Sequence, residues 1–169
     1  MTTIPQNPVI FRRIEARDDP SVARIIRTVM TEFGAVGDGF SIKDAEVQAM
    51  HDAYTRERCA YFVAERDGRV VAGGGIAPLE GSERPDVCEL RKMYALPEAR
   101  GLGIGRRLLE LCLRAAREAG FRTCYLETTG QMHRARLLYE RAGFRAIDRP
   151  MGQTGHYSCD GWFVLDLAT

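Results

Sequence analysis

The sequence predicts one mixed α/β domain spanning residues 1–169. Its length of 169 residues suits a single domain with a sizeable core. Hydrophobic residues make up 45% of the chain and charged residues 28%, which is typical of a globular protein. Strand-like segments are interleaved with segments of helical periodicity in the order β-α-α-β-β-β-α-β-α-β-β, with no repeat or linker between them.

The first half of the chain is expected to supply four strands and two helices. Apolar residues recur at helical spacing in the first helical segment, and Ser41 is positioned to cap the second. Asp67-Gly68 is a typical turn dipeptide and predicts a hairpin. The elements expected here are a strand over 9–14, a helix over 21–33, a glycine-rich loop over 33–41, a helix over 42–55, and strands over 60–65, 69–79 and 87–96.

The second half is expected to supply two helices and three strands. Gly120 and Gly143 stand where helices commonly end, because glycine readily adopts the left-handed conformation that follows a last turn. The expected elements are a helix over 104–119, a strand over 121–129, a helix over 132–142, and closing strands over 144–150 and 161–167 around a loop at 151–160.

Charge and cysteine content exclude several functional classes. Lys and Arg total 24 against 23 Asp and Glu, so a general nucleic-acid or membrane-surface binder is not expected. Five cysteines without short pair spacing argue against a disulfide framework. With no secretory signal pattern or membrane-spanning run, the expected location is cytoplasmic. Three histidines offer no metal-ligand spacing, so no metal is expected.

The stretch "ARGLGIGRRLLE", residues 99–110, has glycine at every second position and then continues into a helix. Glycines let a backbone wrap closely around an anion, and the unpaired amides and dipole of a helix N-terminus favour negative charge there. A glycine turn that binds nothing is the alternative. Neither G-x-G-x-x-G nor G-K-[ST] fits the spacing, so a dinucleotide fingerprint and a Walker A loop are both excluded.

What fits is R-x-x-G-x-G over residues 100–105. Together, "ELRKMYALPEARGLGIGRRLLE" and "YLETTGQMHRARLLYERAGF" resemble motifs A and B of the GNAT superfamily of N-acetyltransferases. The resemblance is specific over residues 87–144, and the order of the other elements also fits. It implies a mixed, mostly antiparallel sheet of about seven strands flanked by about four helices.

The resemblance also implies acetyl-CoA as the acyl donor. Backbone amides of the glycine stretch would bind the diphosphate, and the preceding strand would bind the pantetheine arm through main-chain groups. Many family members carry asparagine seven residues before the motif tyrosine, where this chain has Met132, and Gln131 is the candidate to replace that contact. The expected cofactor-binding residues are Met93, Tyr94, Ala95, Arg100, Gly101, Leu102, Gly103, Ile104, Gly105, Arg106 and Gln131.

Acetyl transfer to an amine needs a base, because an alkylammonium has a pKa near ~10 and must lose a proton. Glu89 and Glu127 end two apolar strands, and in the resembled family the base comes from either strand. Tyr139 occupies the position from which the family's tyrosine reaches the departing sulfur. The expected catalytic residues are therefore Glu89, Glu127 and Tyr139, with the choice of base left open.

The acceptor is expected to be a small-molecule primary amine that attacks acetyl-CoA directly in a ternary complex. The alternatives are a peptide or protein amine, or a CoA-binding regulatory domain without turnover. The loops at 33–41 and 154–162 are expected to face each other across the acceptor cleft. His156 and Cys159 in the second loop leave open a thiol–imidazole pair and a covalent acyl-cysteine route. A homodimer is a further possibility that the family suggests.

Overall fold

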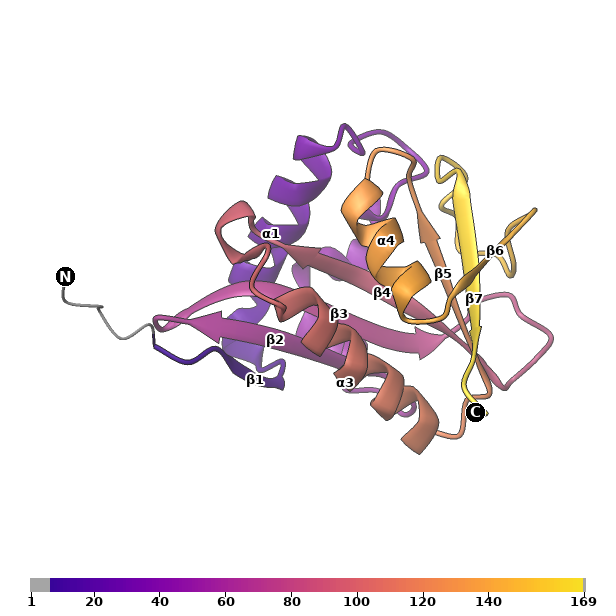
Figure 1. Ribbon diagram of the computed structural model, residues 1–169, viewed down its shortest axis with the longest axis horizontal. Coiled ribbons are helices and arrows are strands. Elements are labelled where there is room, and N and C mark those ends of the chain that lie inside the picture. Colours follow the sequence, from indigo (N-terminus) through magenta and orange to yellow (C-terminus); the bar gives the residue numbers. More distant parts are fainter. Residues whose placement is uncertain (1–6, 169) are drawn as a thin grey trace.

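The computed structural model describes residues 7–168 and contains one seven-stranded sheet with helices on both faces (Figure 1). The strand order across the sheet is β1-β2-β3-β4-β5-β7-β6. Only β4 and β5 run parallel, so the predicted mixed, mostly antiparallel sheet is confirmed. The strands are β1 Ile10–Arg13, β2 Ala60–Arg66, β3 Arg69–Pro78, β4 Val87–Ala95, β5 Thr123–Thr128, β6 Arg145–Ile147 and β7 Gly161–Asp166.

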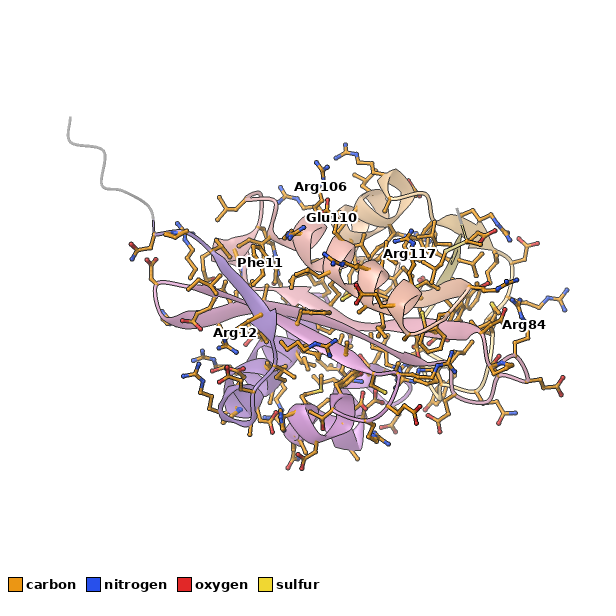
Figure 2. All side chains as sticks on the ribbon, turned by 90° about the horizontal axis from the view of Figure 1, so that it is seen from below. Phe11, Arg12, Arg84, Arg106, Glu110 and Arg117 are labelled. Atoms are coloured by element: carbon orange, nitrogen blue, oxygen red, sulfur yellow. The ribbon has the colours of Figure 1, made fainter. Side chains whose placement is uncertain are left out.

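Four α-helices cover the two faces of the sheet, as Figure 2 shows from the side. Helices α1 (Asp19–Glu32) and α2 (Met50–Tyr54) pack on one face, and α3 (Ile104–Glu118) and α4 (His133–Arg141) on the other. Each long helix buries one apolar stripe in the core, where Ile26 of α1 and Leu108 of α3 are fully buried. In the part of the chain that the structure describes, no helix is both long and apolar enough to span a bilayer.

The segment after α1 differs from the prediction of a continuous helix over 42–55. It forms two short 3₁₀ turns, Ser41–Lys43 and Ala45–Gln48, and only then α2. The break falls at Asp44, whose φ of −62° and ψ of 133° are extended. Its carboxylate binds Lys92, and this long-range contact overrides the helical periodicity. The predicted cap is also wrong, because the Ser41 hydroxyl lies 3.2 Å from the Tyr94 hydroxyl instead of capping a helix.

The sheet splits between β4 and β5. These strands pair only from Val87 with Thr123 to Glu89 with Tyr125. Further along, β4 carries a bulge at Lys92, which has a φ of +48° and shifts the register with β3. The two strands therefore diverge beyond Glu89, and a pocket lies between their ends.

Tyr61 fixes the bulge from inside the core. Its hydroxyl donates a 2.8 Å hydrogen bond to the Lys92 carbonyl. The ring lies so close to β3 that a Cβ on Gly73 would come within 2.7 Å of it. Glycine at this position is thus required for the bulge to be anchored, which explains part of the unusual run Gly73–Gly75 in a strand.

Candidate active site

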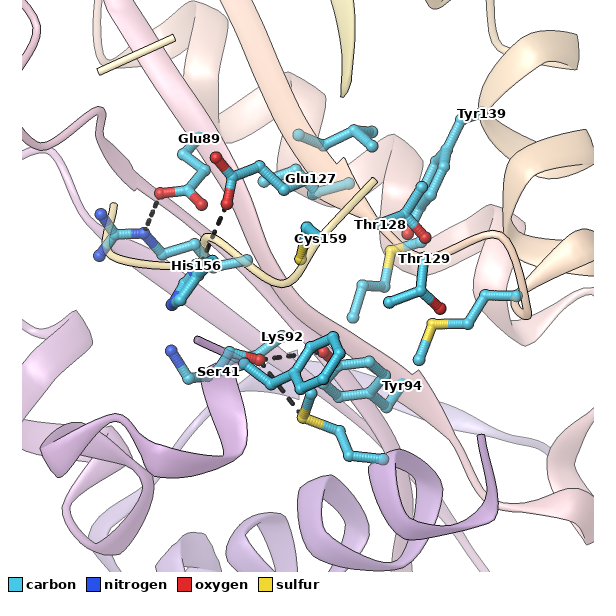
Figure 3. A pocket seen from close by; sticks show the side chains of 17 residues that line it. Ser41, Glu89, Lys92, Tyr94, Glu127, Thr128, Thr129, Tyr139, His156 and Cys159 are labelled. Carbon is cyan, nitrogen blue, oxygen red and sulfur yellow. Dashed lines mark hydrogen bonds and ion pairs between the residues drawn. The ribbon is translucent and has the colours of Figure 1, made fainter. Parts of the chain in front are cut away.

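The pocket between β4 and β5 gathers side chains from distant parts of the sequence (Figure 3). Its apolar walls include Met30 of α1, Phe40 and Met132. Its polar groups fall into two sets. Figure 3 shows Tyr139, Thr128 and Thr129 on one side, and Glu89, Glu127 and His156 on the other, with Cys159 between them. The three predicted catalytic residues, Glu89, Glu127 and Tyr139, therefore line one pocket.

Glu89 is the last residue of β4 that pairs with β5, and its side chain is 3% exposed. Burial raises the pKa of its carboxyl group, and the nearby Arg91 guanidinium opposes that rise only in part. The Arg91 Nε donates a 2.7 Å hydrogen bond to one carboxylate oxygen. Glu89 is therefore a buried carboxyl group whose affinity for a proton is increased.

Glu127, on β5, is surrounded by donors. Its carboxylate accepts hydrogen bonds from the Tyr125 hydroxyl at 2.7 Å and from the Thr154 hydroxyl at 3.0 and 2.9 Å. His156 Nδ1 lies 3.2 Å from the same carboxylate. Although Glu89 and Glu127 lie on neighbouring strands, only Glu127 is fully engaged by the protein itself.

His156 connects Glu127 to Asp44 across the pocket. Its Nε2 lies 3.0 Å from both Asp44 oxygens, while Nδ1 faces Glu127. Burial alone would lower the pKa of the imidazole, but the two carboxylates outweigh it and raise the pKa to about 9. Asp44 also accepts a 2.7 Å bond from the buried Lys92 ammonium, which binds Glu46 as well.

Tyr139, on α4, presents its hydroxyl to the pocket, and its ring packs edge-on against Phe144 with centroids 5.9 Å apart. Burial raises the pKa of the phenol well above its usual value. The hydroxyl oxygens of Thr128 and Thr129 are buried and have no hydrogen-bond partner within residues 7–168. Buried hydroxyls without partners carry a free-energy cost of about 1–3 kcal/mol each, which a ligand with polar atoms would relieve.

Cys159 lies in the pocket, but it forms no pair with His156. Both ring nitrogens of His156 face carboxylates, and burial raises the pKa of the Cys159 thiol to about 12. Such a thiol is scarcely ionised near neutral pH, so the geometry gives no support to the thiol–imidazole pair or to a covalent acyl-cysteine route.

The glycine stretch forms a tight turn that leads into α3. Gly101 and Gly103 have φ angles of +75° and +76°, and nothing lies within 4 Å of where a Cβ would be on either. The Arg100 amide donates a backbone hydrogen bond to Pro97, and the next amide to donate one is that of Arg107, to Gly103. In the described chain, the amides between them have no backbone partner, so residues 101–106 offer an open, donor-rich cradle.

The arginine side chains beside this cradle point elsewhere. Arg100 forms 2.7 Å bonds to the Glu32 carboxylate and a 3.0 Å bond to the Ala95 carbonyl. Arg106 is exposed and pairs with Glu110 on the outer side of α3 (Figure 2). Any anion here would meet backbone amides first.

The other expected cofactor-binding residues have varied surroundings. Met93 and Tyr94 line the pocket, whereas Ala95 is half-buried just beyond it. Leu102 is exposed and Ile104 is buried in the core. Gln131 is exposed and is not part of the pocket wall, which contains the neighbouring Met132 instead.

Several residues of the site carried no recognisable signal in the sequence. Asp44 lies in a segment that reads as an ordinary amphipathic helix, and its partner His156 is 112 residues away. Lys92 reads as a surface lysine on a strand, and only the bulge turns it inward. The two predicted cleft loops were expected to face each other across the cleft, and in the structure they touch, because the Ser158 amide donates to the Gly39 carbonyl at 3.1 Å.

Comparisons with known proteins place the chain in a family. Residues 23–144 match the model of the Acetyltransferase (GNAT) family. The chain is 46% identical over 164 residues to the uncharacterized N-acetyltransferase YjgM of Escherichia coli strain K12, which covers 96% of this chain and 97% of that protein.

Solved structures show the same fold. A GNAT-family acetyltransferase of Staphylococcus aureus Mu50 superposes with a TM-score of 0.83 at 19% identity, covering 95% of this chain and 99% of the other. The acetyltransferase yncA of Salmonella typhimurium, solved with its cofactor acetyl-CoA, superposes with a TM-score of 0.77 at 18% identity, covering 95% of each chain.

Proposed function

Because the chain belongs to the Acetyltransferase (GNAT) family, and is thus an N-acetyltransferase, we propose that it transfers the acetyl group of acetyl-CoA to a small-molecule primary amine. The amine attacks directly, in a ternary complex. The observation that carries this proposal is the composition of the pocket. Its lining includes Glu89, a buried carboxyl group with a raised pKa, and Tyr139, whose phenol faces inward.

The amide cradle fits the diphosphate of acetyl-CoA. The open space before Gly101 and Gly103 would admit phosphate oxygens, and the free amides would donate to them. A Cβ added to Gly105 would lie 3.5 Å from Leu138, the neighbour of Tyr139, so the cradle adjoins helix α4. When bound, acetyl-CoA supplies the activated acetyl thioester.

Glu89 is the better candidate for the base. A general base works best when its pKa approaches the working pH, and burial raises the pKa of Glu89 toward that range. Its carboxylate has one side-chain partner, Arg91, whereas Glu127 is engaged by Tyr125, Thr154 and His156. Glu89 is therefore the carboxylate that remains free to take a proton from the acceptor ammonium.

Tyr139 is placed to assist the leaving thiolate. Because burial holds the pKa of its phenol well above that of a thiol, the hydroxyl donates a strong hydrogen bond to the sulfur and keeps its proton. The sulfur then takes up its proton from solvent or from the protonated base.

A network of paired charges and two interacting loops borders the pocket. Four carboxylates pair with three basic groups in this network: Glu46, Asp44, Glu89 and Glu127 with Arg91, Lys92 and His156. The two loops meet over the pocket through Ser158, whose hydroxyl donates to the Asp38 carbonyl at 2.7 Å. This closure favours a small acceptor over a folded protein.

A panel of primary amines, short peptides and a lysine-rich protein, assayed for CoA release with acetyl-CoA as donor, tests the proposal. We expect release with at least one small amine and less with peptides. Transfer only to peptides or protein would favour the alternative acceptor class. CoA binding measured by calorimetry, without release for any acceptor, would instead indicate a binding domain without turnover.

A further inference from the structure

We propose, on the premise of the acetyl transfer proposed above, that His156 is a positioning residue for that reaction. As an imidazolium shared between Asp44 and Glu127, it holds the loop 151–160 over the acceptor pocket. In that position it also keeps Glu127 occupied, which leaves Glu89 to act as the base. Nothing in the sequence pattern or in the family match assigns this role.

The two carboxylates beside the ring favour protons on both ring nitrogens. Nε2 lies 3.0 Å from the Asp44 oxygens, and Nδ1 lies 3.2 Å from Glu127 (Figure 3 shows the Glu127 side). A neutral imidazole has one N–H and one lone pair, so one nitrogen would direct its lone pair at a carboxylate. Only the imidazolium donates in both directions. The ring is 11% exposed, so solvent does little to weaken these pairs.

The bridge joins three parts of the chain that are far apart in the sequence. Asp44 lies between the two 3₁₀ turns after α1, Glu127 lies on β5, and His156 belongs to the loop before β7. Ser158 adds two contacts between the same loops, but these involve backbone groups of Asp38 and Gly39 and carry no charge. Between the loop and the segment 38–44, the described residues therefore form one titratable link, through His156, and one neutral link, through Ser158, which can be removed separately.

Every ionisable group facing the ring is accounted for. Asp44, Glu127 and Glu89 raise the pKa of His156, and Lys92 and Arg91 lie behind Asp44 and Glu89 respectively. Cys159, on the same loop, has its own pKa raised to about 12 and stays neutral when His156 titrates. When His156 loses its proton, three carboxylates face a neutral ring, and the loop loses its charged link.

The sign of the pH effect follows directly. The pKa of His156 is raised from 6.5 to about 9 in the folded protein, so the ring is protonated at neutral pH and the bridge is lost as the pH rises through 9. The stability that the bridge contributes is fully present below pH 6.5 and is lost over the same rise. The rate of acetyl transfer should therefore fall at alkaline pH as His156 loses its proton. At acidic pH the rate should fall as Glu89 becomes protonated.

An NMR titration of the imidazole tests the bridge without any acceptor. The His156 signals are identified by their absence from His156→Gln. We expect a midpoint near 9 in the wild type, a midpoint lower by about one unit or more in Asp44→Asn, and no change in Ser158→Ala. A wild-type midpoint near 6.5 would overturn the proposal.

Kinetics test the positioning role. In His156→Gln we expect kcat/KM for the acceptor to fall by about tenfold to a hundredfold, with CoA binding unchanged as the check on folding. Asp44→Asn should shift the alkaline decline of the kcat/KM pH profile to lower pH. Ser158→Ala, the control that removes the uncharged link, should leave that decline at the wild-type pH. Equal losses in His156→Gln and Ser158→Ala, with no movement in Asp44→Asn, would reduce His156 to a structural contact.

The two proposals fail in different ways. If no amine is acetylated by the wild type, the proposed function is wrong and the kinetic role of His156 with it. The NMR midpoint would still decide whether the charged bridge exists.

Discussion

At the scale of single residues, the roles of the two glutamates differ because their partners differ. Replacing Glu89 with Gln removes the proposed base, so kcat should fall by roughly a hundredfold to a thousandfold. The matched change Glu127→Gln disturbs the His156 bridge but not the base, and should lower kcat by about tenfold or less. Steady-state rates at saturating acetyl-CoA distinguish the two. A larger loss of kcat in Glu127→Gln than in Glu89→Gln would make Glu127 the base instead of Glu89.

Tyr139 gives a second prediction at this scale. Tyr139→Phe removes only the hydroxyl, and the ring contact with Phe144 persists. A hydrogen bond to a developing thiolate is worth about 1.5–3 kcal/mol, so kcat should fall by about tenfold to a hundredfold while the acetyl-CoA Kd stays within about twofold. Turnover equal to that of the wild type would make Tyr139 a packing residue.

Residue types at motif positions were predictable from the sequence, but their partners were not. Glu89, Glu127 and Tyr139 were identified from strand ends and a motif, and the structure brings all three to one pocket. The contact between His156 and Asp44 depends on how two loops meet, and no local pattern encodes that meeting.

At the scale of elements, the glycine turn before α3 can be tested against a turn of the same shape. Gly103 and Gly120 have φ angles of +76° and +83°, and both face open space. Gly103→Glu and Gly120→Glu thus incur similar backbone strain, about 1 kcal/mol. Only the change at Gly103 adds a carboxylate to the amide cradle.

We therefore expect CoA binding to be lost in Gly103→Glu and retained in Gly120→Glu, as measured by calorimetry. Equal CoA affinity in the two variants would remove the cradle from the proposed binding site.

The bulge of β4 provides another prediction. The Lys92 ammonium is 1% exposed and is the partner of both Asp44 and Glu46. Lys92→Met leaves two carboxylates without their counter-charge and should lower the free energy of unfolding by about 3 kcal/mol. Lys43 is exposed and is the chain's other lysine, so Lys43→Met is the control. Urea denaturation measures both variants, and a stable Lys92→Met protein would contradict the importance of this buried pair.

Element predictions succeeded where the hydrophobic pattern was strong. The helical period of α3, and the β-branched and aromatic runs of β2 and β3 around their turn, predicted these elements to within about two residues. The helix expected over 42–55 was wrong because Asp44 and Glu46 turn toward Lys92, a contact across 46–48 residues that local periodicity cannot reveal.

At the scale of the whole molecule, the family resemblance supplied the mixed, mostly antiparallel sheet of about seven strands, and the residues alone supplied only the sequence of elements. The parallel pairing of β4 with β5 and the antiparallel return of β7 between β5 and β6 are global properties of the sheet. A one-dimensional pattern does not contain them.

The short pairing of β4 with β5 has a consequence for the protein in storage and in the cell. Beyond Glu89 and Tyr125, each strand lacks a neighbour on the facing side, so the sheet contains two unpaired edges in its interior. Free strand edges are templates for unwanted association between chains. A bound donor with amide groups would cover them. Preparations kept with CoA should therefore scatter less light over time than those kept without it, and the donor would serve as the protein's protection against aggregation as well as its substrate.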